Sequence, residues 1–416
     1  MKSQMSSTRT TCATANIRSS FADSTYWNVA TGSAQLEELA EETRLSHLRP
    51  RRLEHDLFWL SRANHGEHST CGAIAFYRGR DLVSYIPFRL RRIKLRLRFG
   101  EVTVARLPFQ ALQLHGDVIV GEKAEVDWVF TALDQVPLPY DGLLLEETPT
   151  DSALWRALKQ GDKSFFIFER SRALHSMIDL PSSYAFYFQG LPRKTRENIR
   201  RHSRKLETQL GRWEVRKFTA PEQVQEMVKL VEAIATKTYH YHLLGQDLTA
   251  SNKQFIRNLN IYAQEGWLRG YLLLGDNRPV AYVFGYLVNG CFQSEQTGYD
   301  PEFAHASPGI FIQLRVIEDL INTGTADLLD YGAGGAGYKQ ELGNRLYEEG
   351  TVLACRRTLY ACSAAISERL FAEASRVGTH VLDRTGLKAQ LKKFLRSKWK
   401  HSSQRRLPSD ATSNIA

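Results

Sequence analysis

The segment 291–342 constrains the fold of this 416-residue chain more than any other part of it. Residues 292–298 alternate polar and apolar side chains, which predicts a strand covered on one face. Pro301 follows closely, and proline cannot donate to a strand ladder, so the strand must end before it. Residues 326–331 are apolar enough for a buried strand. The segment therefore predicts two neighbouring strands with a connection between them.

That connection has the pattern of a helix. Ser307 is a suitable N-cap, Pro308 suits the first helical position, and Gly324 ends the apolar periodicity. A helix between two strands of one sheet is a crossover connection. Its first turn carries free N–H groups, and we expect this turn to be able to hold a phosphate.

Length and composition favour an ordered globular protein with two domains. Hydrophobic residues make up 43% of the chain, which is enough for one large core or two ordinary ones. No apolar run reaches eighteen residues and the N-terminus has no apolar signal core, so we expect a cytoplasmic protein. The five cysteines are scattered, which favours neither a disulfide framework nor a metal site. The net charge of +10 fits an anionic partner, but it also fits a basic protein without one.

We divide the chain into five parts from its composition and its motifs. Residues 1–22 form a disordered leader, for which a targeting peptide is the alternative. Two α/β domains follow at 23–160 and 165–362, then C-terminal helices at 363–400 and a disordered basic tail at 401–416. In the first domain, residues 89–98 alternate apolar and basic residues, as in a strand with a cationic face or an exposed edge protected by charge. We find no catalytic cluster in that domain and expect it to shape a substrate cleft.

A strongly basic helix is predicted near residue 200. Gly211 stops it, and its apolar stripe is narrow. The cations on it are Arg193, Lys194, Arg196, Arg200, Arg201, Arg204 and Lys205. They form either a solvated face or a site for an anionic ligand such as a nucleotide-linked sugar, a lipid phosphate or RNA.

Two further motifs have less definite interpretations. His240 and His242 lie in an aromatic loop without a third ligand nearby, which favours a pocket rim over a metal site. Residues 387–400 have an apolar side and a lysine-rich side. This pattern fits an amphipathic helix that packs on the body or makes a peripheral contact with an anionic membrane.

The basic helix 191–207, the three-strand meander after it and the segments 297–320 and 327–344 together resemble a known family. They are similar to the GNAT acyltransferases of the CelD-like branch, which is named from cellulose-biosynthesis loci. The likeness covers 174–361, and 26–158 resembles the weaker GNAT-like half of that branch. The fold implied is α/β, with two GNAT-like domains in tandem, each a mixed and mainly antiparallel sheet flanked by helices.

The resemblance implies an acyltransferase that uses acyl-CoA, with acetyl-CoA as the expected donor, and no metal. The acceptor implied is a small or sugar-linked amine or hydroxyl compound, in polysaccharide biosynthesis. The pyrophosphate of CoA would rest on the helix N-terminus, and pantetheine would pair with the preceding strand. The positions that correspond are Ser294, Gln296, Thr297, Ala306, Ser307, Pro308, Gly309 and Ile310. This loop departs from the usual GNAT pattern, because it has one glycine where that pattern has two.

Acyl transfer to an amine or hydroxyl needs a base for the acceptor and a proton for the departing thiolate. Glu295, on the strand that would line the cleft, is the candidate base. Tyr338 lies where GNAT enzymes often place a tyrosine acid. Lys339 is a candidate to hold the acceptor or a phosphate, and Asp330 to orient it.

Two alternatives stay open. FemAB-type transferases share the two-domain plan, and a protein of that type would take an aminoacyl group from tRNA through the basic helix. A non-catalytic protein with the same fold would only bind an anionic ligand.

Overall fold

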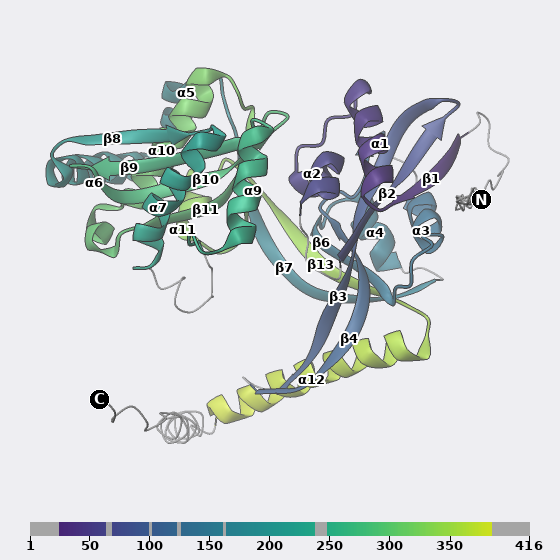
Figure 1. Cartoon of the computed structure of the whole chain (residues 1–416). Helices are drawn as coiled ribbons and strands as arrows, with labels where there is room; N and C mark the ends of the chain where they lie inside the picture. Colours follow the sequence, from purple (N-terminus) through teal and green to yellow (C-terminus); the bar gives the residue numbers. More distant parts are fainter. Residues whose placement is uncertain are drawn as a thin grey trace, which may run out of the picture.

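The computed structural model describes residues 25–63, 69–99, 102–122, 126–160, 164–237 and 248–384. A single mixed sheet of 13 strands runs through both halves of the molecule, with helices on its faces (Figure 1). The predicted fold class, α/β with mainly antiparallel strands flanked by helices, is confirmed.

The N-terminal half carries the first six strands. Its elements are β1 (Thr25–Thr31), α1 (Ser33–Leu45), η1 (Leu53–His55), α2 (Leu57–Arg62), β2 (Ser69–Arg78), β3 (Asp81–Phe99), β4 (Val102–His115), β5 (Val120–Gly121), α3 (Val126–Asp134), β6 (Gly142–Pro149) and α4 (Ala153–Gln160). Asp56 begins α2, because its carboxylate accepts a hydrogen bond from the Trp59 amide at 2.9 Å.

The C-terminal half carries the remaining strands. Its elements are β7 (Phe165–Asp179), α5 (Tyr184–Gly190), α6 (Arg193–Leu210), β8 (Trp213–Phe218), η2 (Pro221–Gln223), α7 (Val224–Ala235), α9 (Lys253–Gln264), β9 (Leu268–Gly275), β10 (Arg278–Val288), β11 (Cys291–Tyr299), η3 (Pro301–Ala306), α10 (Pro308–Thr323), β12 (Leu328–Ala333), α11 (Gly337–Leu342), β13 (Arg345–Arg356) and α12 (Leu359–Arg384). The basic helix expected from the sequence is α6, and the crossover helix is α10.

The two halves are joined through the centre of the sheet. The strand order is β1-β2-β3-β4-β6-β13-β7-β12-β11-β10-β9-β8, so β13 lies between β6 of the N-terminal half and β7. β13 pairs antiparallel with both neighbours, and its register with β7 runs from Arg345↔Met177 to Arg356↔Phe165. The division at 160–165 expected from the sequence therefore falls within one continuous sheet.

In the C-terminal half, helices cover both faces of the sheet. α5, α6 and α10 enclose one core, into which Val283 and Phe292 point. α7 and α9 enclose the other, which holds the neighbouring strand residues Tyr282 and Phe284. Successive residues of β10 thus enter opposite cores, as the period of two in a strand requires.

The two strands beside α10 separate along their length. β11 and β12 pair in parallel from Cys291↔Leu328 to Gln293↔Asp330, where the ladder ends. On its other side β11 stays paired with β10 as far as Tyr299. The pairing jumps there from Gly285↔Ser294 to Phe284↔Gln296, which leaves Glu295 as the extra residue of a β-bulge.

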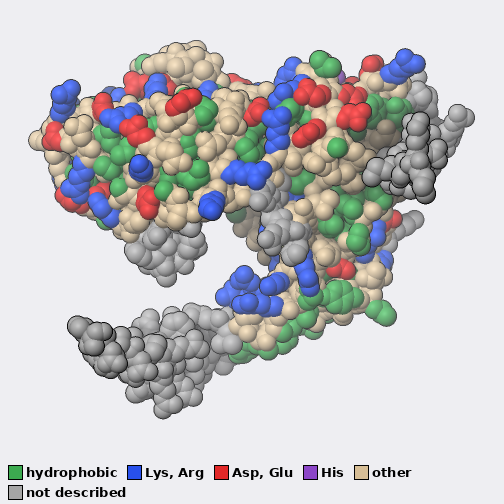
Figure 2. All heavy atoms as spheres, in the orientation of Figure 1, with side chains coloured by type: hydrophobic (Ala, Val, Ile, Leu, Met, Phe, Trp, Pro, Cys, Tyr) green, Lys and Arg blue, Asp and Glu red, His purple; other side chains and the backbone are tan. Residues whose placement is uncertain are grey.

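A long hairpin of β3 and β4 extends from the body and lies against α12 (Figure 1). The small residues Ala361, Ala364 and Ala365 of α12 pack with Leu95 of β3. The opposite side of α12 leaves Leu359, Ile366 and Leu370 exposed, and apolar side chains are visible along its lower edge in Figure 2. α12 begins at Leu359, four residues before the boundary expected from the sequence.

Several expectations lie outside the described residues. These are the leader 1–22, the histidines His240 and His242, the amphipathic segment 387–400 and the tail 401–416. Among the helices that the structure describes, none has the length and apolar character needed to cross a bilayer.

Candidate active site

A cavity of about 350 Å³ lies where the two halves of the molecule meet. Its walls come from η1, α2, β3 and β4 on one side and from α9, β10 and β11 on the other. The residues that line it are Leu53, Glu54, Trp59, Leu60, Pro87, Phe88, Arg89, Gln113, His115, Asn258, Tyr262, Tyr286 and Glu295. The rings of Trp59 and Tyr262 meet across the two halves with their centroids 5.0 Å apart.

Glu295 is the sequence-predicted residue that reaches this cavity. The β-bulge places it there together with Tyr262 and Tyr286. Its side chain is exposed to the open space of the cavity, and protein groups crowd around the carboxylate. Removal from bulk water, together with repulsion from Glu54, raises the pKa of Glu295 to about 7, although a hydrogen bond from the Tyr262 hydroxyl lowers it in part. A carboxylate with this pKa can accept a proton near neutral pH.

Glu54 is a second carboxylate in the same cavity and comes from the N-terminal half. Burial alone would raise the pKa of Glu54, but the neighbouring His115 and Arg52 lower it overall, so the group is ionised at neutral pH. Its Oε2 atom is buried and has no hydrogen-bond partner among the described residues. A buried carboxylate oxygen in this state is ready to accept a hydrogen bond from a ligand.

Basic and amide groups form another part of the cavity wall. Arg89 donates to Oε1 of Gln113 from Nε at 3.0 Å and from Nη2 at 2.6 Å. Arg91 donates to the same oxygen from Nη1 at 3.2 Å. The amide nitrogen of Gln113 in turn donates to Glu146. Burial and the proximity of Arg91 lower the pKa of Arg89.

The predicted phosphate loop lies at the start of α10. Ser307 is its N-cap residue, but it adopts the left-handed conformation (φ 53°, ψ 51°) and its side chain makes no capping bond. Its Oγ lies 3.2 Å from Nδ1 of His202 on α6 instead. The expectation that the Ser307 side chain caps the helix is therefore wrong, because a tertiary contact takes its hydroxyl.

The start of α10 is partly open. Pro308 is buried, whereas Ser307, Gly309 and Ile310 keep part of their surface exposed. Gly309 lies against the ring of Tyr299, since a Cβ on it would be 3.2 Å from the Cδ1 atom of that ring. Ala306 is buried in the core beneath.

On β11, the predicted cofactor-binding residues lie beyond the point where β12 separates. Ser294, Gln296 and Thr297 are each partly exposed. The Thr297 hydroxyl donates to the carbonyl of Tyr282 at 3.2 Å. Because the parallel ladder ends at Gln293, the edge of β11 that faces β12 diverges from that strand here, which is the splayed arrangement expected for a pantetheine site.

The other predicted catalytic residues surround the glycine loop after β12. Tyr338 packs edge-on against Tyr331 and contacts the core under α10, on the opposite face of the sheet from Glu295, and burial raises its pKa to about 12. Lys339 donates from Nζ to the carbonyls of Tyr331 at 2.6 Å and Ala333 at 2.7 Å, and burial lowers its pKa. Lys339 thus holds the glycine loop closed. The structure does not bring Tyr338 and Glu295 together on one face.

Asp330 belongs to a buried ionic cluster. His175 donates from Nε2 to Asp330 at 2.6 Å and from Nδ1 to Glu349 at 2.5 Å, so it links β7 to β12 and β13. Arg52 of the N-terminal half lies 3.5 Å from Asp330 and 2.7 Å from Glu147. Burial opposes ionisation of Asp330, but His175 and Arg52 lower its pKa overall. Asp330 therefore joins the two halves and does not line the cavity with Glu295.

Most cations of α6 are exposed, but they are not equivalent. Arg196 is only partly exposed and donates to the carbonyls of Leu191, at 3.0 Å, and Gln189, which fixes the turn between α5 and α6. Arg193 is exposed and pairs with Glu197 at 2.8 Å. The exposed remainder consists of Lys194, Arg200, Arg201, Arg204 and Lys205.

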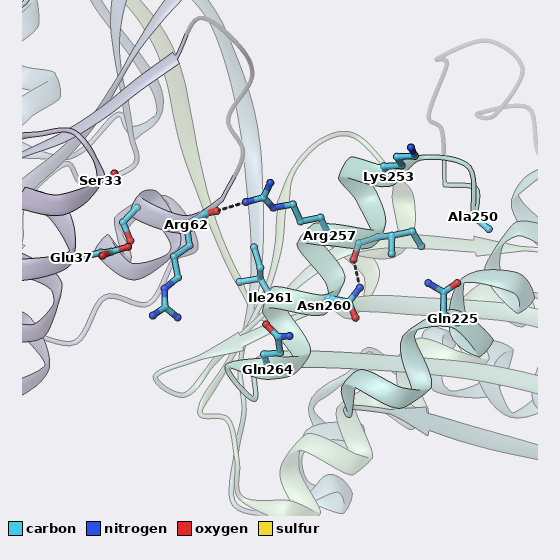
Figure 3. A pocket seen from close by; sticks show the side chains of 12 residues that line it. Ser33, Glu37, Arg62, Gln225, Ala250, Lys253, Arg257, Asn260, Ile261 and Gln264 are labelled. Carbon is cyan, nitrogen blue, oxygen red and sulfur yellow. Dashed lines mark hydrogen bonds between the residues drawn. The ribbon is translucent and has the colours of Figure 1, made fainter.

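A larger groove of about 990 Å³ lies between α1 and α2 on one side and α7 and α9 on the other (Figure 3). Arg257 of α9 reaches across it and donates to the carbonyl of Arg62 at 3.5 Å. α9 thus contributes Arg257 to this groove and Tyr262 to the cavity of Glu295. Among the described residues, no three His, Cys, Asp or Glu side chains are arranged to hold a metal ion.

The cavity residues of the N-terminal half were not identified from the sequence. We expected this half to shape a cleft, and it does so through Glu54, Arg89 and Gln113. In the sequence, only the alternation of apolar and basic residues at 89–98 drew attention to one of these residues, Arg89.

Residues 193–340, from α6 into α11, match the family model of an acetyltransferase (GNAT) domain. This match agrees with the expected GNAT domain in the C-terminal half. The match does not distinguish the CelD-like branch. No curated protein matches the chain.

Solved structures with similar chains include FemX, at 10% identity and a TM-score of 0.48, covering 80% of this chain and 93% of that one. A conserved protein of unknown function from Bacteroides thetaiotaomicron is 14% identical with a TM-score of 0.47, covering 78% and 97%. A tandem GNAT protein from the clavulanic acid biosynthesis pathway is 12% identical with a TM-score of 0.40, covering 80% and 98%. These scores lie below 0.5, too low a similarity to transfer a function.

Proposed function

We propose that the protein transfers an acyl group from acyl-CoA, with acetyl-CoA as the donor, to an amine or hydroxyl acceptor bound in the cavity between its halves. The observation that carries this proposal is the position of Glu295. It lies at a β-bulge beside the point where β11 and β12 separate, in a cavity, with a pKa raised to about 7.

In this reaction Glu295 takes the proton of the acceptor nitrogen or oxygen, which attacks the thioester carbonyl carbon. The carbon–sulfur bond breaks, and the departing thiolate takes up a proton from water. Tyr338, the donor expected from the sequence, lies on the other face of the sheet from Glu295 and has no part in this step. At the partly exposed start of α10 the N–H of Ile310 donates to the Ser307 carbonyl at 3.1 Å, so the backbone N–H of Gly309 is the group offered to the diphosphate. The splayed edge of β11 at Ser294 and Thr297 offers backbone groups for pantetheine.

The sequence adds finer points to this proposal. The CelD-like resemblance favours a small or sugar-linked acceptor and a place in polysaccharide biosynthesis, and the cytoplasmic location stays a prediction. Lys339 and Asp330 keep the glycine loop and the joint between the halves in place, rather than contact the substrate.

The test is CoA-dependent activity of the full chain. We expect CoA and acetyl-CoA to raise the melting temperature, and thiol release from acetyl-CoA to depend on an acceptor. Glu295→Gln should lower kcat by about 10²-fold or more while leaving the KM for acetyl-CoA unchanged. Glu38→Gln, at an exposed position on α1, is the matched control. Normal turnover of Glu295→Gln would exclude it as the base, and the absence of any CoA-induced shift would contradict the whole proposal.

The exposed cations of α6 favour a second candidate, a FemAB-like transferase that takes an aminoacyl group from tRNA. Lys194, Arg200, Arg201, Arg204 and Lys205 are exposed on this one helix. Retention of tRNA that falls steeply with salt, and that is lost when Arg201 and Arg204 are both changed to Glu, would support this candidate. CoA binding that does not depend on salt would support the first candidate, a transferase that uses acyl-CoA.

A further inference from the structure

One face of α12 carries large apolar side chains that are exposed to solvent. Leu359, Ile366 and Leu370 keep 94%, 48% and 63% of their surface exposed. Their spacings of seven and four residues place them on one stripe of the helix. The opposite face, which includes Ala361, packs with Leu95 of the β3–β4 hairpin. The stripe is therefore not the side that attaches α12 to the body, and apolar side chains line the outer edge of this helix in Figure 2. A contiguous exposed apolar surface of this kind is typical of an interaction site.

The amphipathic segment that follows α12 in the sequence is too short to cover this stripe as a packed helix. α12 ends at Arg384, and the amphipathic pattern spans residues 387–400. A helix over these residues would be about 21 Å long, which is also the length of α12 between Arg384 and Leu370. Folded back along α12, such a helix would reach Leu370 but neither Ile366 nor Leu359. Most of the stripe therefore needs another occupant.

The charge beside the stripe is positive. Residues 384–406, which continue the chain from the last residue of α12, are rich in Lys and Arg and contain no Asp or Glu. On α12 itself, Glu373 falls on the side of the stripe, and it pairs with Arg376 at 3.0 Å. A second copy of the chain would bring the same net charge of +10 to this surface, whereas an anionic lipid surface would complement it. The charge therefore favours lipid over self-association.

We propose that α12 makes a peripheral contact with an anionic membrane surface. The helix lies in the plane of the surface, and its apolar stripe enters the boundary between the headgroups and the acyl chains. The Lys and Arg residues that follow it in the sequence bind the headgroup anions. This inference does not depend on the proposed acyl transfer, because the cavity of Glu295 is lined by other elements of the molecule.

The test is co-sedimentation of the full chain with lipid vesicles. One set of vesicles contains phosphatidylcholine alone, and the other contains equal parts of phosphatidylcholine and phosphatidylglycerol. The protein should bind the mixed vesicles at least about tenfold more strongly, and added salt should weaken this binding because it screens the headgroup charge. If the protein binds neither kind of vesicle, or binds both equally, the inference is overturned.

Variants of the stripe assign the contact to α12. The double variant Leu359→Ser, Leu370→Ser should bind the mixed vesicles about tenfold or more weakly, because two apolar side chains no longer enter the lipid. Leu359→Ser alone should show part of this loss. The control is Leu45→Ser, because Leu45 ends α1 and is 90% exposed. Melting temperatures check that each variant is folded.

Two results would contradict the contact through α12. Unchanged vesicle binding in the folded double variant, or in Leu359→Ser if the double variant does not fold, would place the contact elsewhere on the molecule. Self-association of the unmodified protein without vesicle binding, if the same substitutions abolish it, would identify a second copy of the chain as the occupant of the stripe. Analytical ultracentrifugation measures the self-association.

Discussion

A β-carbon on Gly285 would lie 1.9 Å from the carbonyl oxygen of Gln293, so β10 can approach β11 at the bulge only where it carries glycine. The bulge is what leaves Glu295 unpaired and in the cavity. The position of the candidate base therefore depends on the absence of a side chain on the neighbouring strand.

We expect Gly285→Ala to destabilise the protein and to lower activity together. The added methyl group meets backbone atoms, which cannot rotate away, so β10 and β11 must shift apart at a cost of roughly 1–3 kcal/mol. Thermal denaturation and thiol release measure the two effects. Gly190→Ala is the control, because a Cβ there has no atom within 4 Å. A Gly285→Ala protein with unchanged melting temperature and turnover would show that the bulge tolerates a side chain.

The pH dependence of activity should report the ionisation of Glu295. Activity should rise with pH through about 7, as the carboxylate loses its proton and becomes able to act as a base. Tyr262→Phe removes the hydroxyl that donates to the ionised carboxylate and lowers its pKa, so the rise should move to higher pH. Profiles of kcat/KM for the unmodified protein, Tyr262→Phe and the control Tyr360→Phe measure this shift. If activity rises at the same pH in all three proteins, the Tyr262 hydroxyl does not influence the pKa of Glu295.

Local patterns were sufficient to predict the elements around the site. The crossover helix α10 begins at Pro308 and ends at Gly324, as expected. The turn of Asn289 and Gly290, both at positive φ, joins β10 to β11 as a two-residue hairpin, for which an Asn-Gly pair is a typical sequence. These features depend on backbone conformations that particular residues favour. They can therefore be read from short stretches of sequence.

The composition of the cavity could not be predicted in this way. Glu54 and Glu295 are 241 positions apart in the sequence and meet because β13 inserts between β6 and β7 and draws the two halves together. Nothing next to Glu54 in the sequence indicates that it lines a cavity. Ser307 gives the converse case, since its N-cap position was predicted but its hydroxyl is taken by His202 from another helix. Long-range strand pairing brings Glu54 and Glu295 into one cavity, and a tertiary contact determines the partner of the Ser307 hydroxyl, so neither feature can be predicted from a short stretch of sequence.

Gly309→Val should weaken CoA binding by about tenfold or more while the protein stays folded. Its β-carbon would lie 3.2 Å from the ring of Tyr299, and the branched side chain would cover the backbone N–H of Gly309 at the start of α10. Titration with CoA measures the affinity, and Ala304→Val, at an exposed position of η3, is the control. Unchanged affinity in Gly309→Val would remove this loop from the CoA site.

Stability should fall as the pH rises from about 6.5 to 9, because of His175. Burial opposes its protonation, but hydrogen bonds to Asp330 and Glu349 outweigh this and raise its pKa to about 9. The folded state thus holds this proton more tightly than the unfolded state, so the stabilisation is complete below pH 6.5 and is lost as the pH approaches 9. The loss amounts to roughly 3 kcal/mol. Urea unfolding at pH 6, 7.5 and 9 measures it. His175→Gln should be less stable at pH 6 and should lack this slope, whereas His47→Gln, on the loop after α1, should retain it. An equal slope in the His175→Gln protein would mean that another group carries the pH dependence.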